Sequence, residues 1–97
     1  MLTTQEETTV RRGLAASNLL ANEDFRELIQ SMMVESFAVF TETKPDEGAK
    51  REEHYHLCQA LKQIEAELLA RVQAKDALEL RENLDDEDEL SEDDDNI

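Results

Sequence analysis

The chain contains few of the residues that break helices, form sharp turns or cross-link a fold. Its 97 residues include two glycines, one proline, one cysteine and no tryptophan. Good helix formers such as Ala, Leu, Glu, Gln, Arg and Lys dominate the rest. The composition therefore predicts an all-α fold. A single cysteine excludes an internal disulfide framework and is typical of a reducing compartment.

Long hydrophobic runs are also missing. No window approaches the roughly 20 apolar residues that a membrane span requires. Met1–Thr9 has neither a basic start nor an apolar run, so we expect no signal peptide. These absences predict a cytoplasmic protein that does not bind a membrane.

Basic residues are scarce, and the C-terminal end has none. The formal net charge is −15, and residues 82–97 carry ten acidic groups without a basic one. This balance disfavours direct binding of nucleic-acid phosphates, which requires Lys and Arg clustered on a face. Because like charges repel and apolar residues are few there, we expect a disordered acidic tail over residues 82–97, behind a helical domain of residues 1–81.

The acidic tail allows two interpretations. It either keeps the chain soluble, or it is an arm that docks on the basic surface of a partner protein. A calcium loop is disfavoured because the glycine and the final glutamate that such a loop needs are missing. The arm would consist of Asp85, Asp86, Glu87, Asp88, Glu89, Glu92, Asp93, Asp94 and Asp95.

A first helix is predicted over about residues 5–20. Thr3 with Glu6, and Thr4 with Glu7, match the T-x-x-E pattern of a capping box. Helical spacing then gives this segment one face that we expect to pack against the rest of the chain. That face consists of Val10, Leu14, Ser17 and Ala21.

Two longer helices are predicted to follow, over about residues 22–43 and about residues 47–72 or longer. Asn22 is a favoured N-cap for the first of them, and Pro45 lies in the short turn between them. Because that turn is short, the two helices are expected to form an antiparallel α-hairpin. Lys75 interrupts the apolar stripe of the last helix, which predicts that packing ends nearby. The stripe consists of Leu57, Leu61, Ile64, Leu68 and Val72.

The segment 22–43 is more apolar than a surface helix usually is. Its apolar side chains cover roughly 180° of the helix, against about 100° for an ordinary amphipathic helix. Either the other two helices cover all of this surface, or part of it contacts another chain, and we expect a homo-oligomer because so short a domain is marginally stable alone. The candidate protein-interaction residues are Met32, Met33, Val34, Phe37, Val39, Phe40, Arg51 and Tyr55.

No constellation of residues indicates catalysis or metal binding. His54 and Cys58 share one face of a helix, but His56 points away from them, and the chain has no further His or Cys to complete a zinc site. Cys58 also lacks identifiable oxyanion donors for work as a nucleophile. The sequence predicts a non-enzymatic protein with no catalytic residue, no metal site and no cofactor.

Residues 19–69 carry a recurring arrangement of features. Leu19 and Leu20 precede an Asn22-x-x-Phe25 helix start, and a Thr/Pro/Asp turn follows an aromatic stretch. The remaining matching residues are Phe37, Phe40, Arg51, Glu52, Tyr55, Leu57, Leu61, Ile64 and Leu68. This pattern resembles the small helical-hairpin proteins encoded beside the head and packaging genes of tailed bacteriophages.

The resemblance implies an oligomeric accessory of virion assembly or DNA packaging, located in the bacterial host cytoplasm or in the virion. Its partner would be a basic surface of a portal, capsid or terminase component. A first alternative is an acidic inhibitor, a nucleic-acid mimic that blocks a host nucleic-acid-binding protein. A second is a small terminase-like packaging subunit, in which a ring could gather Arg11, Arg12 and Arg26 on one rim.

Overall fold

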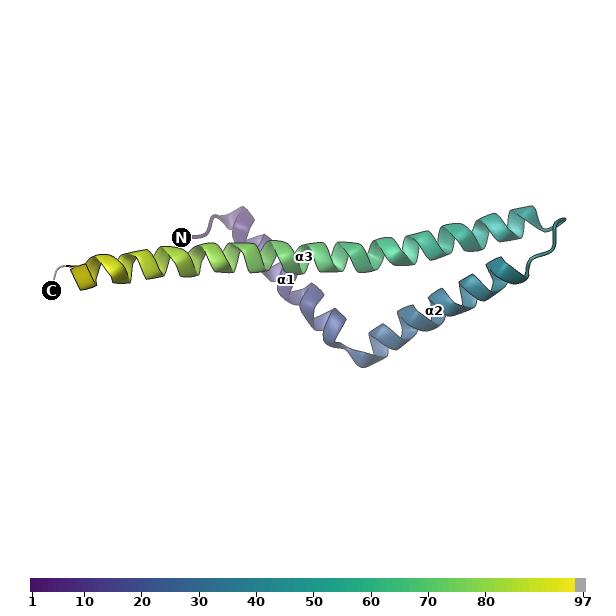
Figure 1. Cartoon of the computed structure of the whole chain (residues 1–97), viewed down its shortest axis with the longest axis horizontal. Helices are drawn as coiled ribbons and strands as arrows, with labels where there is room; N and C mark the ends of the chain where they lie inside the picture. Colours follow the sequence, from purple (N-terminus) through teal and green to yellow (C-terminus); the bar gives the residue numbers. More distant parts are fainter. Residues whose placement is uncertain (96–97) are drawn as a thin grey trace.

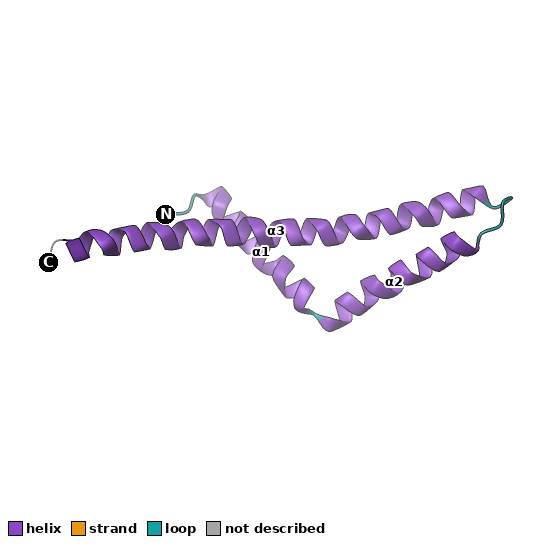
Figure 2. Cartoon of the chain, in the orientation of Figure 1, coloured by secondary structure: helices purple, strands orange, loops and turns teal. Residues whose placement is uncertain are grey.

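Helical hydrogen bonding satisfies almost the whole backbone of this chain. The structure, a computed structural model, describes residues 1–95, with side chains to Asp86. Its described part forms three helices and no strand: α1 (Thr4–Ala21), α2 (Glu23–Glu42) and α3 (Gly48–Asp95) (Figures 1 and 2). The predicted all-α class is confirmed, and the first two helices begin and end within a residue or two of the expected positions.

The long helix α3 is the axis on which the other two helices lie. α2 runs back along its N-terminal half, and α1 crosses its C-terminal half (Figure 1). The molecule measures 78 × 23 × 21 Å, and its radius of gyration of 21.3 Å exceeds the roughly 12–13 Å of a compact domain of this length. The predicted arrangement, an α-hairpin of the second and third helices with the first helix added at its side, is not confirmed. In the structure, α1 packs on α3 more extensively than α2 packs on α3.

Side-chain caps set where the first two helices begin. The Thr3 hydroxyl accepts a hydrogen bond from the Glu6 amide at 3.1 Å, and the Thr3 amide donates to the Glu6 carboxylate at 3.0 Å, which completes a capping box. Asn22 serves both neighbouring helices. Its amide donates to the Leu19 carbonyl at 3.1 Å, while its side chain accepts from the Phe25 amide at 2.9 Å. One residue therefore ends α1, starts α2 and creates the bend between them.

The crossing of α1 and α3 depends on small residues. Gly13 and Ala16 are buried there, and a Cβ atom on Gly13 would overlap the Cβ of Lys75 and lie 2.6 Å from the carbonyl oxygen of Arg71. The prediction that Leu14 and Ala21 belong to the packed face is wrong, because both are exposed. Packing selects the face on which the two backbones can approach most closely.

The contact surface of α3 also differs from the predicted stripe. Leu61 is buried and Leu68 and Val72 are half-buried, but Leu57 and Ile64 are exposed. The covered positions of α3 are instead residues 51, 54, 58, 61, 68, 72, 75, 78 and 82. Their spacing follows a seven-residue repeat, which is the period that keeps one side of a long helix against its neighbours.

Packing on α3 extends beyond the predicted limit at Lys75. The side chain of Lys75 is only 13% exposed, and half-buried Glu82 lies 3.5 Å from the amino terminus of Met1. Disorder over residues 82–97 is not confirmed, because α3 continues to Asp95 without a glycine or proline after Gly48 to interrupt it. Residues 96 and 97 lie outside the described part, and the division into residues 1–81 and 82–97 stays a prediction.

Candidate protein-interaction surface

The folded chain has very little core of its own. Among the described side chains, the buried apolar residues are Ala16, Ile29 and Leu61, and no large side chain is completely buried. The accessible surface is 7701 Å², whereas a compact monomer of 11.1 kDa exposes about 5,700 Å². The chain therefore exposes about 2,000 Å² more than a compact monomer of its mass, as expected for a molecule that measures 78 × 23 × 21 Å.

The interaction residues expected from the sequence divide into two groups. Val34 is 61% exposed, Phe37 62% and Tyr55 46%. The others are half-buried, and they are Met32, Met33, Val39, Phe40 and Arg51. Phe40 packs on Tyr55, with ring centroids 6.0 Å apart and planes tilted by 39°, so this part of the surface is engaged within the chain. Whether the exposed group contacts a partner remains a prediction.

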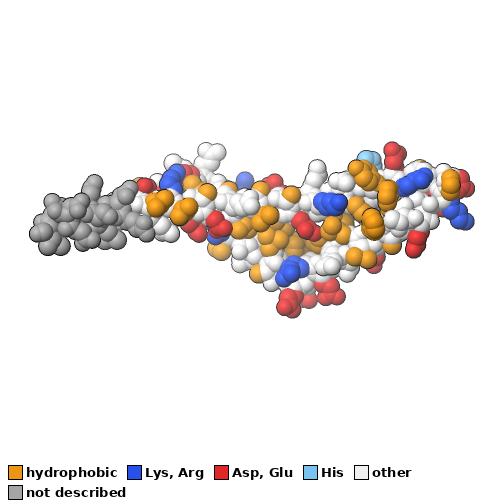
Figure 3. Space-filling view, viewed as in Figure 1, with side chains coloured by type: hydrophobic (Ala, Val, Ile, Leu, Met, Phe, Trp, Pro, Cys, Tyr) orange, Lys and Arg blue, Asp and Glu red, His pale blue; other side chains and the backbone are white. Residues whose placement is uncertain are grey.

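A hollow of about 450 Å³ lies where α1 and α2 meet beside α3. The bend at Asn22 holds this joint away from α3, and Figure 3 shows an apolar patch in the angle between the helices. The lining residues are Leu20, Phe25, Arg26, Ile29, Gln30, Met33, Val34 and Glu65. Sequence reasoning missed Leu20, Phe25 and Ile29 as members of one site, although a cap at Asn22, two residues after Leu20, was a signal of such a bend.

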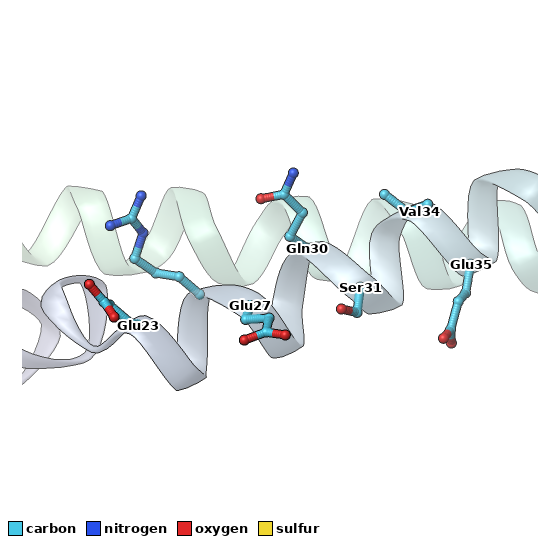
Figure 4. A pocket seen from close by; sticks show the side chains of 7 residues that line it. Glu23, Glu27, Gln30, Ser31, Val34 and Glu35 are labelled. Atoms are coloured by element: carbon cyan, nitrogen blue, oxygen red, sulfur yellow. The ribbon is translucent and has the colours of Figure 1, made fainter.

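The outer surface of α2 is a second, more open hollow with no organised chemistry. In Figure 4 the side chains of Glu27, Ser31 and Glu35 project from one side of α2, whereas Gln30 and Val34 project from the other. The carboxylates of Glu23, Glu27 and Glu35 are spread along one helix. Among the described residues, no group of three or more His, Cys, Asp and Glu side chains could hold a metal ion.

The histidines and the cysteine are dispersed as well. His54 is half-buried on the covered side of α3, and its Nδ1 atom has no hydrogen-bond partner. His56 is exposed and packs edge-on to Tyr55, with ring centroids 5.7 Å apart. Cys58 is a free, half-buried thiol.

The strongest electrostatic contact fastens the start of α1 to α3. Arg81 Nη1 lies 2.7 Å from Glu6 Oε2. This hydrogen bond from Arg81, together with the amide of Thr3, lowers the pKa of Glu6 from 4.5 to about 2, and the same contact raises the pKa of Arg81. Hydrogen bonds to Asp76 and Glu79 likewise raise the pKa of Lys75. These charges position helices rather than forming a reactive centre.

This contact predicts a specific acid response. Since folding lowers the pKa of Glu6, its contribution to stability is complete above about pH 4.5 and disappears as the pH falls from there towards about 2. Glu6→Gln should therefore lower the melting temperature near pH 6 and have no effect near pH 2. Glutamine can still complete the capping box, so the difference isolates the ion pair. Thermal unfolding followed by circular dichroism measures it.

Glu7→Gln is the matched control for this experiment. Glu7 is the next residue of α1, is exposed and forms no ion pair within the described part of the chain. Its replacement removes the same formal charge but should leave the melting temperature nearly unchanged at both pH values. Equal effects of the two substitutions would show that net charge, and not the contact with Arg81, determines the response.

Comparison with known proteins identifies no family for this chain. No protein-family model, no curated protein and no solved structure matches this chain. Within the described part, no helix combines the length and the apolar character that crossing a membrane would take. The fold itself is an elongated all-α arrangement in which several large apolar side chains are exposed.

Proposed function

We propose that this chain is a non-enzymatic protein–protein interaction protein that acts as a homo-oligomer. The observation that carries the proposal is the mismatch between its core and its surface: three buried apolar residues in the described part against exposed Val34, Phe37 and Tyr55. A soluble monomer rarely leaves contiguous large apolar side chains in water. Phe and Met supply much buried area at interfaces and adapt to the partner's shape.

The unit that associates is the hairpin of α2 with the N-terminal half of α3. Following the resemblance of residues 19–69, the assembly is an accessory of phage virion formation or DNA packaging, working in the host cytoplasm or the virion. The acidic residues from Asp85 onward then face a basic portal, capsid or terminase surface. From Glu87 on, the side chains of this arm lie outside the described side chains, and its contacts are part of the proposal.

Light scattering coupled to size-exclusion chromatography tests the oligomer. At micromolar concentration, the wild-type mass should be a multiple of 11.1 kDa. Phe37→Glu should shift the mass towards one chain, because it places a charge in the apolar contact, while helix content measured by circular dichroism stays the same. Gln63→Glu, which adds the same charge to an exposed position of α3, should leave the mass unchanged. A wild-type chain that is strictly monomeric ends the proposal.

A second candidate function is the acidic inhibitor, a nucleic-acid mimic. A mimic needs carboxylates at fixed positions on an ordered backbone. The continuation of helix α3 through the acidic segment to Asp95 favours this candidate. Its binding to a basic partner should weaken steeply with salt. Deletion of residues 83–97 separates the two functions, since a mimic loses its binding whereas self-association persists.

A further inference from the structure

Exposed apolar side chains lie on two opposite sides of the hairpin. Because each helical residue turns 100°, residues nine apart point in opposite directions. Leu28 and Phe37 are such a pair on α2, and both are exposed, by 56% and 62%. Tyr55 and Ile64 are such a pair on α3, with exposures of 46% and 45%. Each helix therefore has an apolar flank on both sides of the seam between them.

The contact of Phe40 with Tyr55 shows which flanks belong together. Phe40 follows Phe37 by about one turn, and its ring centroid is 6.0 Å from that of Tyr55, so Phe37 and Tyr55 lie on the same side. This side, which we call the basic face, comprises Arg26, Phe37, Arg51, Tyr55 and Lys62 and borders the 450 Å³ hollow. The opposite side, which we call the acidic face, comprises Asp24, Leu28, Glu35, Glu53, Leu57 and Ile64.

The charged residues that define the two faces are complementary in sign. Within the described residues, the three cations of the basic face and the three carboxylates of the acidic face form no ion pair. The cations beside the acidic face are already engaged: Lys50 lies 3.7 Å from Glu47 and Arg71 lies 3.0 Å from Glu67. Two carboxylates lie on the basic side as well: Glu65 lines the 450 Å³ hollow, and Glu23 lines the outer hollow of α2 beside Arg26. Each face therefore attracts the other and repels its own copy.

Exposed apolar side chains on both faces provide for two contacts for each chain. One partner contributes about 800 Å² to an interface of standard size. A two-fold dimer uses the same patch on both chains. It would cover one apolar face, leave the other in water and bring like charges together.

We propose that copies of this chain pack side by side, with the basic face of one copy on the acidic face of the next. The inference rests on the proposed self-association and specifies its surfaces, its partner and its symmetry. The exposed Leu28, Leu57 and Ile64 of one copy cover the hollow and Phe37 of its neighbour. Such a heterologous contact repeats, so each chain binds two others and the assembly contains more than two chains.

Complementary variants test this arrangement on the full chain. Phe37→Glu with Tyr55→Glu disables the basic face, and Leu28→Lys with Ile64→Lys disables the acidic face. All four positions are exposed, but Tyr55 also packs on Phe40, so circular dichroism must first show that the helix content of each variant is unchanged. By light scattering the wild type should exceed the mass of two chains, each variant alone should have the mass of one chain, and an equimolar mixture should have the mass of two chains.

Charge reversal provides a second test that leaves every apolar residue in place. Reversing the basic face with Arg26→Glu and Lys62→Glu, or the acidic face with Glu35→Lys and Glu53→Lys, should weaken assembly at least tenfold at low salt. Combining all four substitutions in one chain restores the formal net charge of −15, and it should also restore assembly. Added salt should reduce the effect of each single reversal.

Three results would overturn the inference. A wild-type mass of two chains that only the basic-face variant abolishes would identify a two-fold dimer and leave the proposed self-association intact. A mixture that stays monomeric while the wild type assembles would show that the two faces do not meet each other. A monomeric wild type would remove the inference together with the proposed function.

Discussion

Leu61→Ala should be among the most destabilising single substitutions in this chain. Leu61 is 3% exposed and is one of three buried apolar residues in the described part. Truncating a buried leucine to alanine costs about 2–5 kcal/mol, while a whole domain is stable by only about 5–15 kcal/mol. Because few other buried side chains stabilise the fold, the variant should be largely unfolded at 37 °C. Urea unfolding followed by circular dichroism measures the loss.

Leu80→Ala is the matched control, since it makes the same chemical change in the same helix at a side chain that is 60% exposed. Its free energy of unfolding should stay within about 0.5 kcal/mol of the wild-type value. All three proteins must be compared at one protein concentration, because self-association contributes to apparent stability. If Leu61→Ala were no more destabilising than Leu80→Ala, the inference that Leu61 is buried where the other helices pack on α3 would be wrong.

Gly13→Ala should separate α1 from α3. Alanine normally stabilises a helix by about 1 kcal/mol relative to glycine, yet here its Cβ would meet the backbone carbonyl of Arg71 at 2.6 Å and the Cβ of Lys75. Neither atom is the free end of a flexible side chain, so the helices must move apart. Overpacking of this kind costs about 1–3 kcal/mol. Hydrogen exchange of the α1 amides should accelerate as the helix detaches.

Gly48→Ala is the corresponding control. At Gly48 the nearest atom to an added Cβ is Arg51 Nη2, at 3.9 Å, which is an ordinary contact. This substitution should leave the free energy of unfolding unchanged or raise it slightly, and exchange in α1 should not respond. Faster exchange in α1 caused equally by both substitutions would refute a specific close approach at Gly13.

Local chemistry follows directly from the order of the residues. Thr3 and Asn22 present oxygen acceptors to amides that lack helical partners, and the chain provides only one short turn, around Pro45, so the starts of α1 and α2 follow from residues within one turn of each cap. These features depend on residue type and on neighbours in sequence.

Which face of α1 and of α3 becomes buried could not be predicted in the same way. The stripe with Leu57 and Ile64 and the face with Leu14 both have helical spacing, yet the structure leaves these three side chains exposed. The predicted stripe and the covered positions of α3 are both spaced by three and four residues, and they differ in which side of α3 faces α1 and α2. Periodicity alone does not distinguish the two.

By itself, the sequence determined that this protein is helical, where its first two helices begin, and that its apolar content is too large for one surface stripe. Tertiary structure alone decided that α1 lies across the C-terminal half of α3, with Gly13 at the crossing, and that the bend at Asn22 opens a hollow. It also decided which apolar side chains remain in water. The physical reason is that caps and turns act over a few residues, whereas close approach and burial depend on which distant backbones come together.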